Sequence, residues 1–550
     1  MGRLGWLVAV AGLAVCGSST QGGADLAPGD LGPGVLSPKV VATPEVPGLA
    51  SQLDASGSTD SLGRTITFAW TVVAAPSGST VKDASLSSAS GAKISFEADL
   101  GGDYQVKLTV STPDGATASV TTTVTVPTLA LFYQQGTFTT GGSSVALGMV
   151  RSDGSGAHLV SCPIASDAGA DSINGFAFAS FYAVSAFDAA AGSGQRSRFA
   201  FPEAAGNQQR LLIADEQSDC ATHAPVRVDQ SSDMFYSTKV HFWPRFSPDG
   251  SRVVYVDNPR SPPASRLVSV AVDGSALRVI RTGTGADLSA APPVWVDATH
   301  VAWVENLGTA MAPKHVIYQS SDASFAGDST SAPGDRTTLA DCTNVLAVLN
   351  QFAVTPAGVI VAGGTQPKAK GGALNLYRMT NGQCTTSNVL VEEPANGDAG
   401  DFAVSPDGKL LAISSTHGQS IPDGGATPQH DIFVLPTGGA SPPTKLAGDP
   451  LTDDLGPRWV AGGRQLVWTQ GSLLADGGLR GGGLMIANAD GTHVRSLVAE
   501  GDAQGEKTVI IGGTNSGVSC SWVGATGGGM GASALVALGL LLLFLRRRST

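Results

Sequence analysis

Short runs in which apolar and polar residues alternate mark the first ordered part of the chain. In residues 65–72 the even-numbered positions hold Ile, Phe, Trp and Val, whereas threonine occupies most of the odd positions. Residues two apart lie on the same face of a strand, so this run predicts a strand with one buried face. Similar runs at 93–96, 104–110 and 118–126 complete the pattern. Together they predict a small β-sandwich over residues 39–127.

A second pattern repeats between residues 128 and 500. The segment Phe246–Tyr255 reads Phe-Ser-Pro-Asp-Gly before an apolar run, and Phe402–Ala412 repeats it, with weaker copies near Val294, Phe352 and Arg458. A second signature, an apolar run followed by Asp-Gly or Asn-Gly, alternates with it. Both signatures supply the residues of tight hairpin turns, and the repeat of roughly fifty residues fits one four-stranded blade. We count seven candidate units and predict a β-propeller of six to seven four-stranded blades.

Composition supports an all-β fold and excludes one class of partner. The chain holds 71 glycines in 550 residues, and 14% of its residues are charged. Such a chain is poor in the charged, helix-favouring runs of amphipathic helices and rich in turns. The fold class we predict is therefore all-β, with an N-terminal immunoglobulin-like β-sandwich followed by the propeller. The net charge of −12 gives no basic surface for phosphates, so we expect no nucleic-acid partner.

The N-terminal residues 1–20 have the pattern of an export signal. An early arginine precedes the apolar run Leu4–Val15, which is too short to span a bilayer. The run ends in Leu13–Cys16, which resembles a bacterial lipobox with Cys16 as the lipidated residue, although Val15 is larger than the residue usual before that cysteine. The alternative is ordinary cleavage without lipidation. Residues 21–38 are rich in glycine and proline and are expected to form a flexible linker.

The C-terminal end carries a three-part tail. A glycine-rich linker with Cys520 covers residues 501–531, and residues 532–550 form a short transmembrane or sorting tail that ends in Arg546, Arg547 and Arg548. The arginines favour the cytoplasmic side. This order resembles the myxobacterial C-terminal sorting signal, although Ser519 replaces the glycine usual before the cysteine; the alternative is a plain single-pass anchor. We therefore expect export to the outer membrane or cell surface, with the protein membrane-anchored or released after processing.

The predicted sandwich resembles a known family in motif order and spacing. The segments Leu53–Asp60, Phe68–Trp70, Gly102–Val110 and Asp114–Thr117 resemble the PKD (polycystic kidney disease) family of immunoglobulin-like domains. Within this region we expect Trp70 to lie in the core.

Two interpretations, turn capping and calcium binding, are open for three polar residues of the first motif. They are Asp54, Ser56 and Asp60. We favour capping of turns by these side chains, and a calcium site is the alternative.

The repeats resemble a second family, the TolB-like β-propellers with WD40-like repeats. The segments that resemble this family are the aromatic-Ser-Pro-Asp-Gly and Asn-Ala-Asp-Gly segments between residues 129 and 498. The resemblance implies a propeller whose partner is another envelope protein. TolB-like propellers often have six blades, so six and seven both remain open.

Four cysteines lie in the propeller region, namely Cys162, Cys220, Cys342 and Cys384. An even number in an exported domain is typical of disulfides, and four cysteines allow three connectivities. We favour pairing Cys162 with Cys220 and Cys342 with Cys384, because each pair would join adjacent blades. No two of them have the Cys-x-x-Cys spacing of zinc or redox sites.

No catalytic constellation is evident, and we assign no catalytic, cofactor-binding or metal-binding residue. No serine has the spacing of a nucleophile elbow. We interpret His241, His315 and His430 as structural, and the acidic pairs Glu392–Glu393 and Asp453–Asp454 as solvated loop charges.

The leading hypothesis is a non-enzymatic binding or scaffold protein that docks a protein, peptide or glycan on its propeller and contacts the membrane through its tail or a lipid. The alternatives are a secreted enzyme, such as a polysaccharide lyase or glycosidase with a PKD-like accessory domain, and a spacer with a purely structural role.

Overall fold

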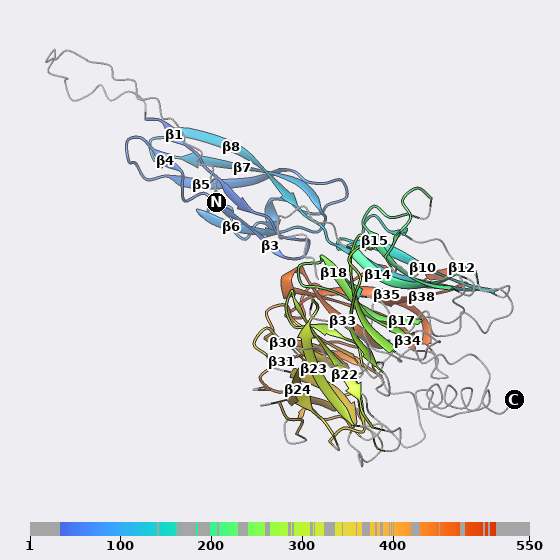
Figure 1. Ribbon diagram of the computed structural model, residues 1–550. Coiled ribbons are helices and arrows are strands. Elements are labelled where there is room, and N and C mark those ends of the chain that lie inside the picture. The colour runs from blue at the N-terminus through green and yellow to red at the C-terminus, as the bar shows by residue number, and fades with distance from the viewer. Residues whose placement is uncertain are drawn as a thin grey trace, which may run out of the picture.

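A computed structural model describes residues 34–512 with internal gaps, of which the longest are 166–182, 185–197, 229–239, 324–335, 366–374 and 420–428. The described elements are β-strands, with single-turn 3₁₀ helices at η1 (Asp83–Ser85) and η4 (Ala461–Gly463). The expected all-β class is therefore confirmed, and two domains follow one another along the chain (Figure 1). Among the described residues, no helix has the length and apolar character needed to cross a bilayer.

The N-terminal domain is a sandwich of two three-stranded antiparallel sheets. One sheet has the order β2-β3-β6 and the other β5-β7-β8, while β1 pairs with β4. The strands are β1 (Leu36–Ser37), β2 (Val41–Thr43), β3 (Ala50–Asp54), β4 (Thr59–Asp60), β5 (Thr67–Ala74), β6 (Lys93–Glu97), β7 (Gly102–Ser111) and β8 (Thr117–Val126). Because β1 begins at Leu36, the predicted boundary at residue 38 is wrong by a few residues.

The alternation seen in the sequence places one face of each long strand in the core of this sandwich. In β5, Phe68 and Val72 pack against the core and Trp70 is buried within it. The indole Nε1 of Trp70 donates to the carbonyl of Gly91 at 2.8 Å. The prediction that Trp70 is a core residue is confirmed, and its one polar atom is satisfied.

Seven antiparallel sheets follow the sandwich among the described residues. We number them in chain order and call them blades. Blade 1 contains β9 (Ala130–Thr139), β10 (Gly142–Arg151), β11 (His158–Leu159), β12 (Ile164–Ala165), β37 (Gly501–Ala503) and β38 (Glu506–Gly512). Blade 2 contains β13 (Ala183–Val184), β14 (Arg198–Ala205), β15 (Gln208–Asp215) and β16 (Val226–Arg227). Blade 3 contains β17 (Val240–Phe246), β18 (Arg252–Asn258), β19 (Ser265–Ala271) and β20 (Arg278–Gly283).

The remaining four blades repeat the same four-stranded plan. Blade 4 contains β21 (Val294–Trp295), β22 (His300–Asn306), β23 (His315–Ser321) and β24 (Thr337–Asp341). Blade 5 contains β25 (Val348–Val354), β26 (Ile360–Thr365), β27 (Asn375–Met379) and β28 (Val389–Val391). Blade 6 contains β29 (Asp401–Val404), β30 (Leu410–Ser415), β31 (Asp431–Pro436) and β32 (Thr444–Ala447). Blade 7 contains β33 (Thr452–Val460), β34 (Gln465–Leu473), β35 (Leu479–Asn488) and β36 (Arg495–Val498).

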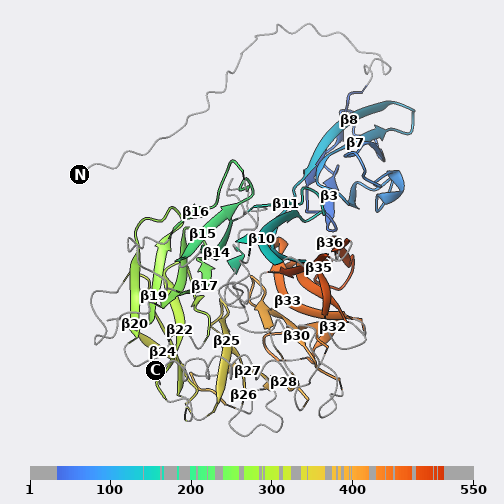
Figure 2. The ribbon, with the colours of Figure 1, turned by 90° about the vertical axis from the view of Figure 1, so that its right-hand side faces the viewer.

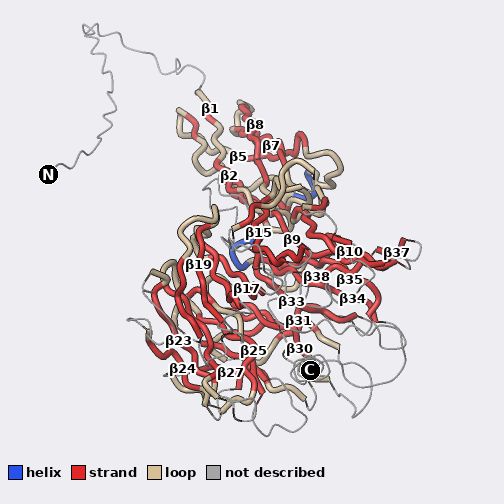
Figure 3. The backbone as a smooth tube through the Cα atoms, turned by 45° about the vertical axis from the view of Figure 1, so that its right-hand side comes forward, coloured by secondary structure: helices blue, strands red, loops and turns tan. Residues whose placement is uncertain are grey.

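The blades are arranged in a ring with their first strands innermost. Along the chain from blade 3 to blade 7, each first strand contacts the next: β17 with β21, β21 with β25, β25 with β29, and β29 with β33. Figure 2 looks onto the ring, and β17, β25 and β33 lie nearest its centre. Figure 3 shows that both domains are built from strands joined by short turns. The architecture is a β-propeller, and seven blades agree with the higher of the two predicted numbers.

The ring is closed by the end of the described chain. Strand β38 pairs antiparallel with β9, from Lys507 opposite Phe138 to Gly512 opposite Tyr133, and β37 pairs with β38. In blade 1, β37 and β38 therefore come from the C-terminal side of the described chain, and β9 to β12 come from the N-terminal side. The predicted boundary at residue 500 is wrong, because residues 501–512, predicted as part of the linker, belong to the propeller.

The repeated sequence signatures form the hairpin corners that were predicted. In the first, the Ser247 hydroxyl donates to Asp249 Oδ1 at 2.6 Å, and Gly250 adopts a φ of 65°. Ser405 and Asp407 make the same bond at 2.6 Å in blade 6. Aspartate caps the turn and glycine adopts the left-handed backbone that other residues disfavour. The Asp-Gly corners of the second signature have the same positive φ at Gly154, Gly274 and Gly491.

The sandwich is fixed against the propeller by buried contacts. Val46 is buried in a cluster with residues of blades 1 and 7. Gln465 Nε2 donates to the carbonyl of Pro47 at 3.0 Å, and Asn488 Nδ2 donates to the carbonyl of Gly48 at 2.9 Å. Gly48 has a φ of 87°, and a Cβ there would lie 3.1 Å from the Gln465 amide, so this approach requires glycine.

Further polar contacts surround this interdomain contact. They join Glu45 to Arg464, Glu97 to His493 and Gly101 to Asp153. The PKD-like sandwich and the propeller therefore meet through both apolar and polar groups, which holds the sandwich at a fixed place on the ring.

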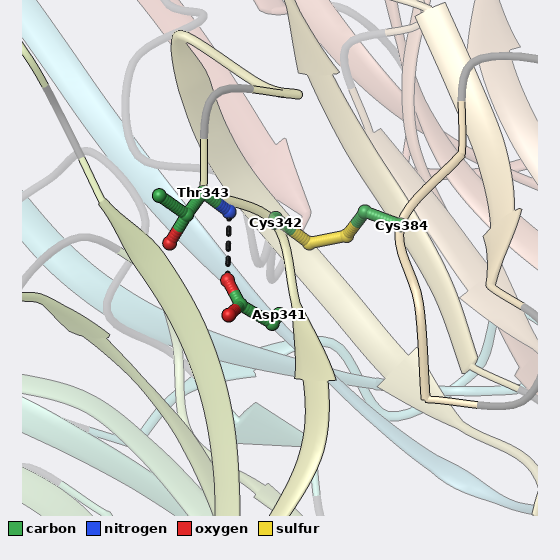
Figure 4. Close-up of a disulfide and its surroundings, with 4 residues drawn as sticks. All are labelled: Asp341, Cys342, Thr343 and Cys384. Carbon is green, nitrogen blue, oxygen red and sulfur yellow. Dashed lines mark hydrogen bonds between the residues drawn. A yellow bond between two sulfur atoms is a disulfide. The ribbon is translucent and has the colours of Figure 1, made fainter.

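A disulfide joins blades 4 and 5. Cys342 follows β24 and Cys384 follows β27, and the two Cα atoms lie 4.9 Å apart (Figure 4). Asp341 Oδ1 accepts from the backbone N–H of Thr343 at 2.9 Å beside it. Both cysteines are buried in the apolar cluster between the two blades. This is the pairing favoured from the sequence, and it links adjacent blades as expected.

Candidate functional site

In five consecutive blades, the residue immediately before an aromatic residue of the inner strand is paired with the second strand. In blades 5 and 6 this residue lies farther from the hairpin corner than in blades 3, 4 and 7. The residues at this position, from blade 3 to blade 7, are Arg245, Val294, Gln351, Asp401 and Arg458. The aromatic residues that follow them are Phe246, Trp295, Phe352, Phe402 and Trp459. We call the five residues before the aromatics the axial layer, because each lies on the first strand of its blade, next to the axis.

Three members of the axial layer come directly after an irregularity in their strand. The register shifts between Phe242 and Arg245 in β17, just before Gln351 in β25, and just before Arg458 in β33. A β-bulge bends the strand and changes the direction in which the next side chain points. Proline precedes both arginines and lacks the N–H that a regular ladder would use.

Contacts within the axial layer run from one blade to the next. Arg458 Nη2 lies 3.1 Å from Asp401 Oδ2, so blade 7 forms an ion pair with blade 6. Gln351 Nε2 donates to the carbonyl of Phe402 at 2.7 Å. The indole N–H of Trp295 donates to the carbonyl of Arg245 at 3.0 Å, and that of Trp459 to a blade 6 carbonyl. These bonds hold the inner strands together around the axis.

Arg245 differs from the other charged members of the layer. Its Nη1 donates to the carbonyl of Pro244 at 3.1 Å, and no carboxylate among the described residues lies within ion-pair distance. Burial lowers the pKa of Arg245 to about 9, the positive charge of Arg458 lowers the pKa as well, and Asp401 raises it. Blades 4, 5 and 6 separate blade 3 from blade 7 on one side of the ring, and blades 1 and 2 on the other. Arg245 and Arg458 therefore belong to inner strands on opposite sides of the ring.

Buried acidic residues at the contacts of blades 5, 6 and 7 form a second polar group and correct a sequence prediction. Asp453 and Asp454 are buried on β33, and Glu393 is buried after β28. The interpretation of these acidic pairs as solvated loop charges is wrong for these three residues. His430 Nδ1 lies 2.9 Å from Asp453 Oδ1, and Asp454 Oδ1 accepts from the indole of Trp468 at 2.8 Å. The donors come from other strands, so the carboxylates are satisfied inside the protein.

Asp454 is expected to give the protein a distinct pH dependence. Burial raises the pKa of Asp454 to about 6, outweighing the hydrogen bonds from Gln470 and Trp468, which lower it; the nearby Asp453 and Asp431 raise it further. In the folded state the Asp454 carboxyl keeps its proton up to about pH 6, whereas in the unfolded chain it releases the proton near pH 4. The free energy of unfolding due to this group therefore falls as the pH rises from about 4 to 6, by roughly 3 kcal/mol in total.

The substitution Asp454→Asn tests this dependence. The amide oxygen still accepts from Trp468, and no proton is lost in this range. We expect the thermal midpoint of the variant to rise relative to wild type between pH 4 and 7, with Asp273→Asn, at an exposed turn, as the control. Parallel pH profiles for wild type and Asp454→Asn would show that the carboxyl is not protonated in the folded state.

The other residues singled out from the sequence have mainly structural contacts where the structure describes them. Asp54 Oδ1 accepts from the backbone N–H of Ser56 at 2.8 Å, and Asp60 bonds Arg64, which lowers the pKa of Asp60 to about 2. The capping interpretation is confirmed, and no cluster of three or more metal-binding side chains lies within the described residues. His315 is buried at the start of β23 and bonds a backbone carbonyl.

Several predicted residues fall outside the described ranges. They are Cys16, Cys162, Cys220, Cys520, Arg546, Arg547 and Arg548, and the side chain of His241 also lies outside the described part. The pairing of Cys162 with Cys220, lipidation of Cys16, the sorting tail and the structural role of His241 stay predictions.

The axial layer was not predicted from the sequence, although its signal is present there. The segments Pro244-Arg245-Phe246 and Pro457-Arg458-Trp459 repeat the same Pro-Arg-aromatic order in two blades. Aligning the residue before each aromatic across the repeats would have brought the five positions together.

Comparison with known families identifies the N-terminal domain. Residues 43–126 match a family model of the PKD domain. Among curated proteins, none matches the chain significantly.

Solved structures resemble the propeller region at low sequence identity. A puromycin-hydrolysing peptidase of Mycobacterium tuberculosis is 14% identical over 72% of this chain, with a TM-score of 0.42, and the match spans 52% of that peptidase. An oligogalacturonate lyase of Vibrio parahaemolyticus is 12% identical over 69% of this chain and 88% of its own, with a TM-score of 0.42. A putative TolB of Agrobacterium tumefaciens is 13% identical over 70% of this chain and 98% of its own, with a TM-score of 0.30.

Proposed function

We propose that this protein is an exported, envelope-anchored or surface-displayed binding protein. Its propeller docks a protein, peptide or glycan, and its PKD domain acts as a spacer of fixed orientation. The proposal of export depends on the two chain ends and on the presence of a PKD domain at residues 43–126.

The observation that carries the binding role is the charged axial layer. A propeller is held together by apolar packing between blades, so its axis needs no charges for stability. Taking charges out of water costs free energy unless they are paired. Arg245 has no carboxylate partner among the described residues, whereas Arg458 is paired with Asp401. An unpaired guanidinium at this place favours a ligand-binding role over a purely structural one.

An enzyme is the second candidate, and one observation favours it. The pKa of Asp454 is raised to about 6, which is a property of carboxyl groups that act as acids in catalysis. Asp454 is fully buried and bonded to Trp468 and Gln470, so a substrate has no direct access to it. We therefore place binding first, and turnover of a polysaccharide or peptide by the purified protein would reverse this order.

Protease treatment of intact cells tests the exported location. With an antibody against the PKD domain, the full-length band is expected to disappear when protease is added outside, while a cytoplasmic marker protein stays intact. Cys520→Ser is expected to alter processing of the tail or surface display, and Cys342→Ser serves as a cysteine control outside the tail. Recovery of the protein from the cytosol would contradict the proposal, and unchanged display of Cys520→Ser would leave a plain anchor.

A further inference from the structure

The charges of the axial layer do not balance. Two guanidinium groups, Arg245 and Arg458, and one carboxylate, Asp401, occupy its five positions. Arg458 Nη2 and Asp401 Oδ2 lie 3.1 Å apart, and their side chains are 11% and 2% exposed, so this carboxylate is already paired. Within these five positions one positive charge is left over, and it belongs to Arg245, which has no carboxylate partner among the described residues.

The backbone of Arg245 is held in place, while most of its guanidinium is not engaged. Pro244 fixes the preceding backbone, and Trp295 Nε1 binds the Arg245 carbonyl at 3.0 Å. The guanidinium has five N–H groups. Among the described residues, it makes one hydrogen bond, from Nη1 to the Pro244 carbonyl at 3.1 Å. A planar fork of N–H donors therefore remains on a residue whose backbone is held in the ring. Such a fork matches the two oxygens of a carboxylate.

The neighbouring charges limit which anion fits. One uncompensated positive charge matches a single negative charge. A doubly charged phosphate would bring a second negative charge into a layer that already holds the Asp401 carboxylate. Gln351 is bonded to the backbone of Phe402 through both ends of its amide and is not free to bind a ligand. The axial layer is thus suited to one singly charged, planar group.

We propose that the axial layer binds the carboxylate of a small ligand through Arg245. This inference rests on the proposed binding function and names the chemical class of the ligand. The carboxylate replaces water at the guanidinium and forms a bidentate pair, while Asp401 keeps Arg458 in its ion pair. The group can come from a peptide C-terminus or from a sugar acid, and both present the same planar anion.

Calorimetric titration of the purified full chain tests the inference with matched pairs of probes. N-acetylglycine is compared with N-acetylglycinamide, and D-glucuronate with D-glucose, so that each carboxylate has a neutral counterpart. We expect saturable binding of at least one acid and at least about tenfold weaker binding of its neutral counterpart. Binding of N-acetylglycine alone assigns a peptide C-terminus, and binding of D-glucuronate alone assigns a sugar acid. Failure of both acids to bind, or tighter binding of inorganic phosphate, would overturn the proposal.

Two substitutions with opposite expected effects assign the binding to Arg245. Arg245→Gln removes the unpaired charge and is expected to weaken binding of the acid at least about tenfold. Asp401→Asn releases Arg458 from its ion pair and is expected to tighten binding. Arg278→Gln, whose partner Asp322 lies at the border of blades 3 and 4, is the control and should bind like wild type. Equal binding by Arg245→Gln, or weaker binding by Asp401→Asn, would contradict the assignment.

Failure of the carboxylate assignment can be distinguished from failure of the proposed function. Binding is measured on purified protein, whereas display is measured on intact cells. Loss of carboxylate binding with display intact would refute only the ligand class, and a cytosolic location with binding intact would refute only the exported role.

Discussion

Ending the chain after residue 500 is expected to open the propeller and lower its thermal midpoint by roughly 10 °C or more. Such a chain lacks β37 and β38. The six residue pairs between β38 and β9 carry about six backbone hydrogen bonds, worth roughly 0.5–1.5 kcal/mol each. Strand β38 also contacts β34 and β35, so it joins blade 7 to blade 1. Its loss leaves the edge of β9 unpaired, which favours aggregation.

A chain that ends after residue 512 is the matched control. It removes the tail but keeps both closing strands, and we expect the thermal midpoint of the full-length protein. The two chains differ by only twelve residues, so a difference between them reports on closure rather than on the tail. Equal midpoints for the two truncated chains would show that β38 does not close the ring.

The repeated part of the propeller was predictable because its information is local. A corner such as Ser247–Gly250 needs a hydroxyl, an aspartate cap and a residue at positive φ within a few positions, and these residue types are visible in the sequence. The alternation in β5 likewise fixes its buried face without knowledge of its neighbours. The PKD sandwich, the blade plan and the Cys342–Cys384 bridge follow from such signals.

Closure of the propeller and burial of its acidic residues depend on contacts between distant segments, which the local sequence pattern does not reveal. The pairing of Lys507 with Phe138 joins segments far apart in sequence, and the glycine-rich surroundings of β38 resemble a linker. Asp453 and Asp454 look like loop charges until the donors from His430, Trp468 and Gln470 are placed beside them. Each of these errors has the same physical origin, because the partner that stabilises the segment belongs to another strand or blade.

The axial layer combines both situations. The Pro-Arg-aromatic repeats around Arg245 and Arg458 are local and could have been found by aligning the blades. The pairing of Arg458 with Asp401, and the lack of a carboxylate partner for Arg245 in the described part of the chain, could not be found in this way, because they depend on which blades are neighbours in the ring.

Glu305→Ala is expected to destabilise the propeller by about 3–5 kcal/mol, because it removes the shared partner of a buried charge cluster. Glu305 lies on β22 and is fully buried. Its Oε1 lies 3.0 Å from Arg281 Nε of blade 3 and 3.4 Å from Arg336 Nη1, and it accepts from Trp303 Nε1 at 2.9 Å. The Arg336 guanidinium also lies 4.1 Å from the ring centre of Tyr318. Alanine would leave two cations without their carboxylate and an indole N–H without its acceptor.

Thermal and urea unfolding of three variants separate the charge from the hydrogen bonds. Glu305→Gln keeps an acceptor for Trp303 but loses the charge, so we expect a smaller loss than for Glu305→Ala. Glu97→Ala removes a half-exposed carboxylate that pairs with His493 and is expected to cost at most about 1 kcal/mol. An effect of Glu305→Ala no larger than that of Glu97→Ala would mean that the contact between blades 3 and 4 is maintained by apolar packing alone. In that case the apolar cluster that contains Trp303, Val254 and Leu267 would be sufficient to join the two blades.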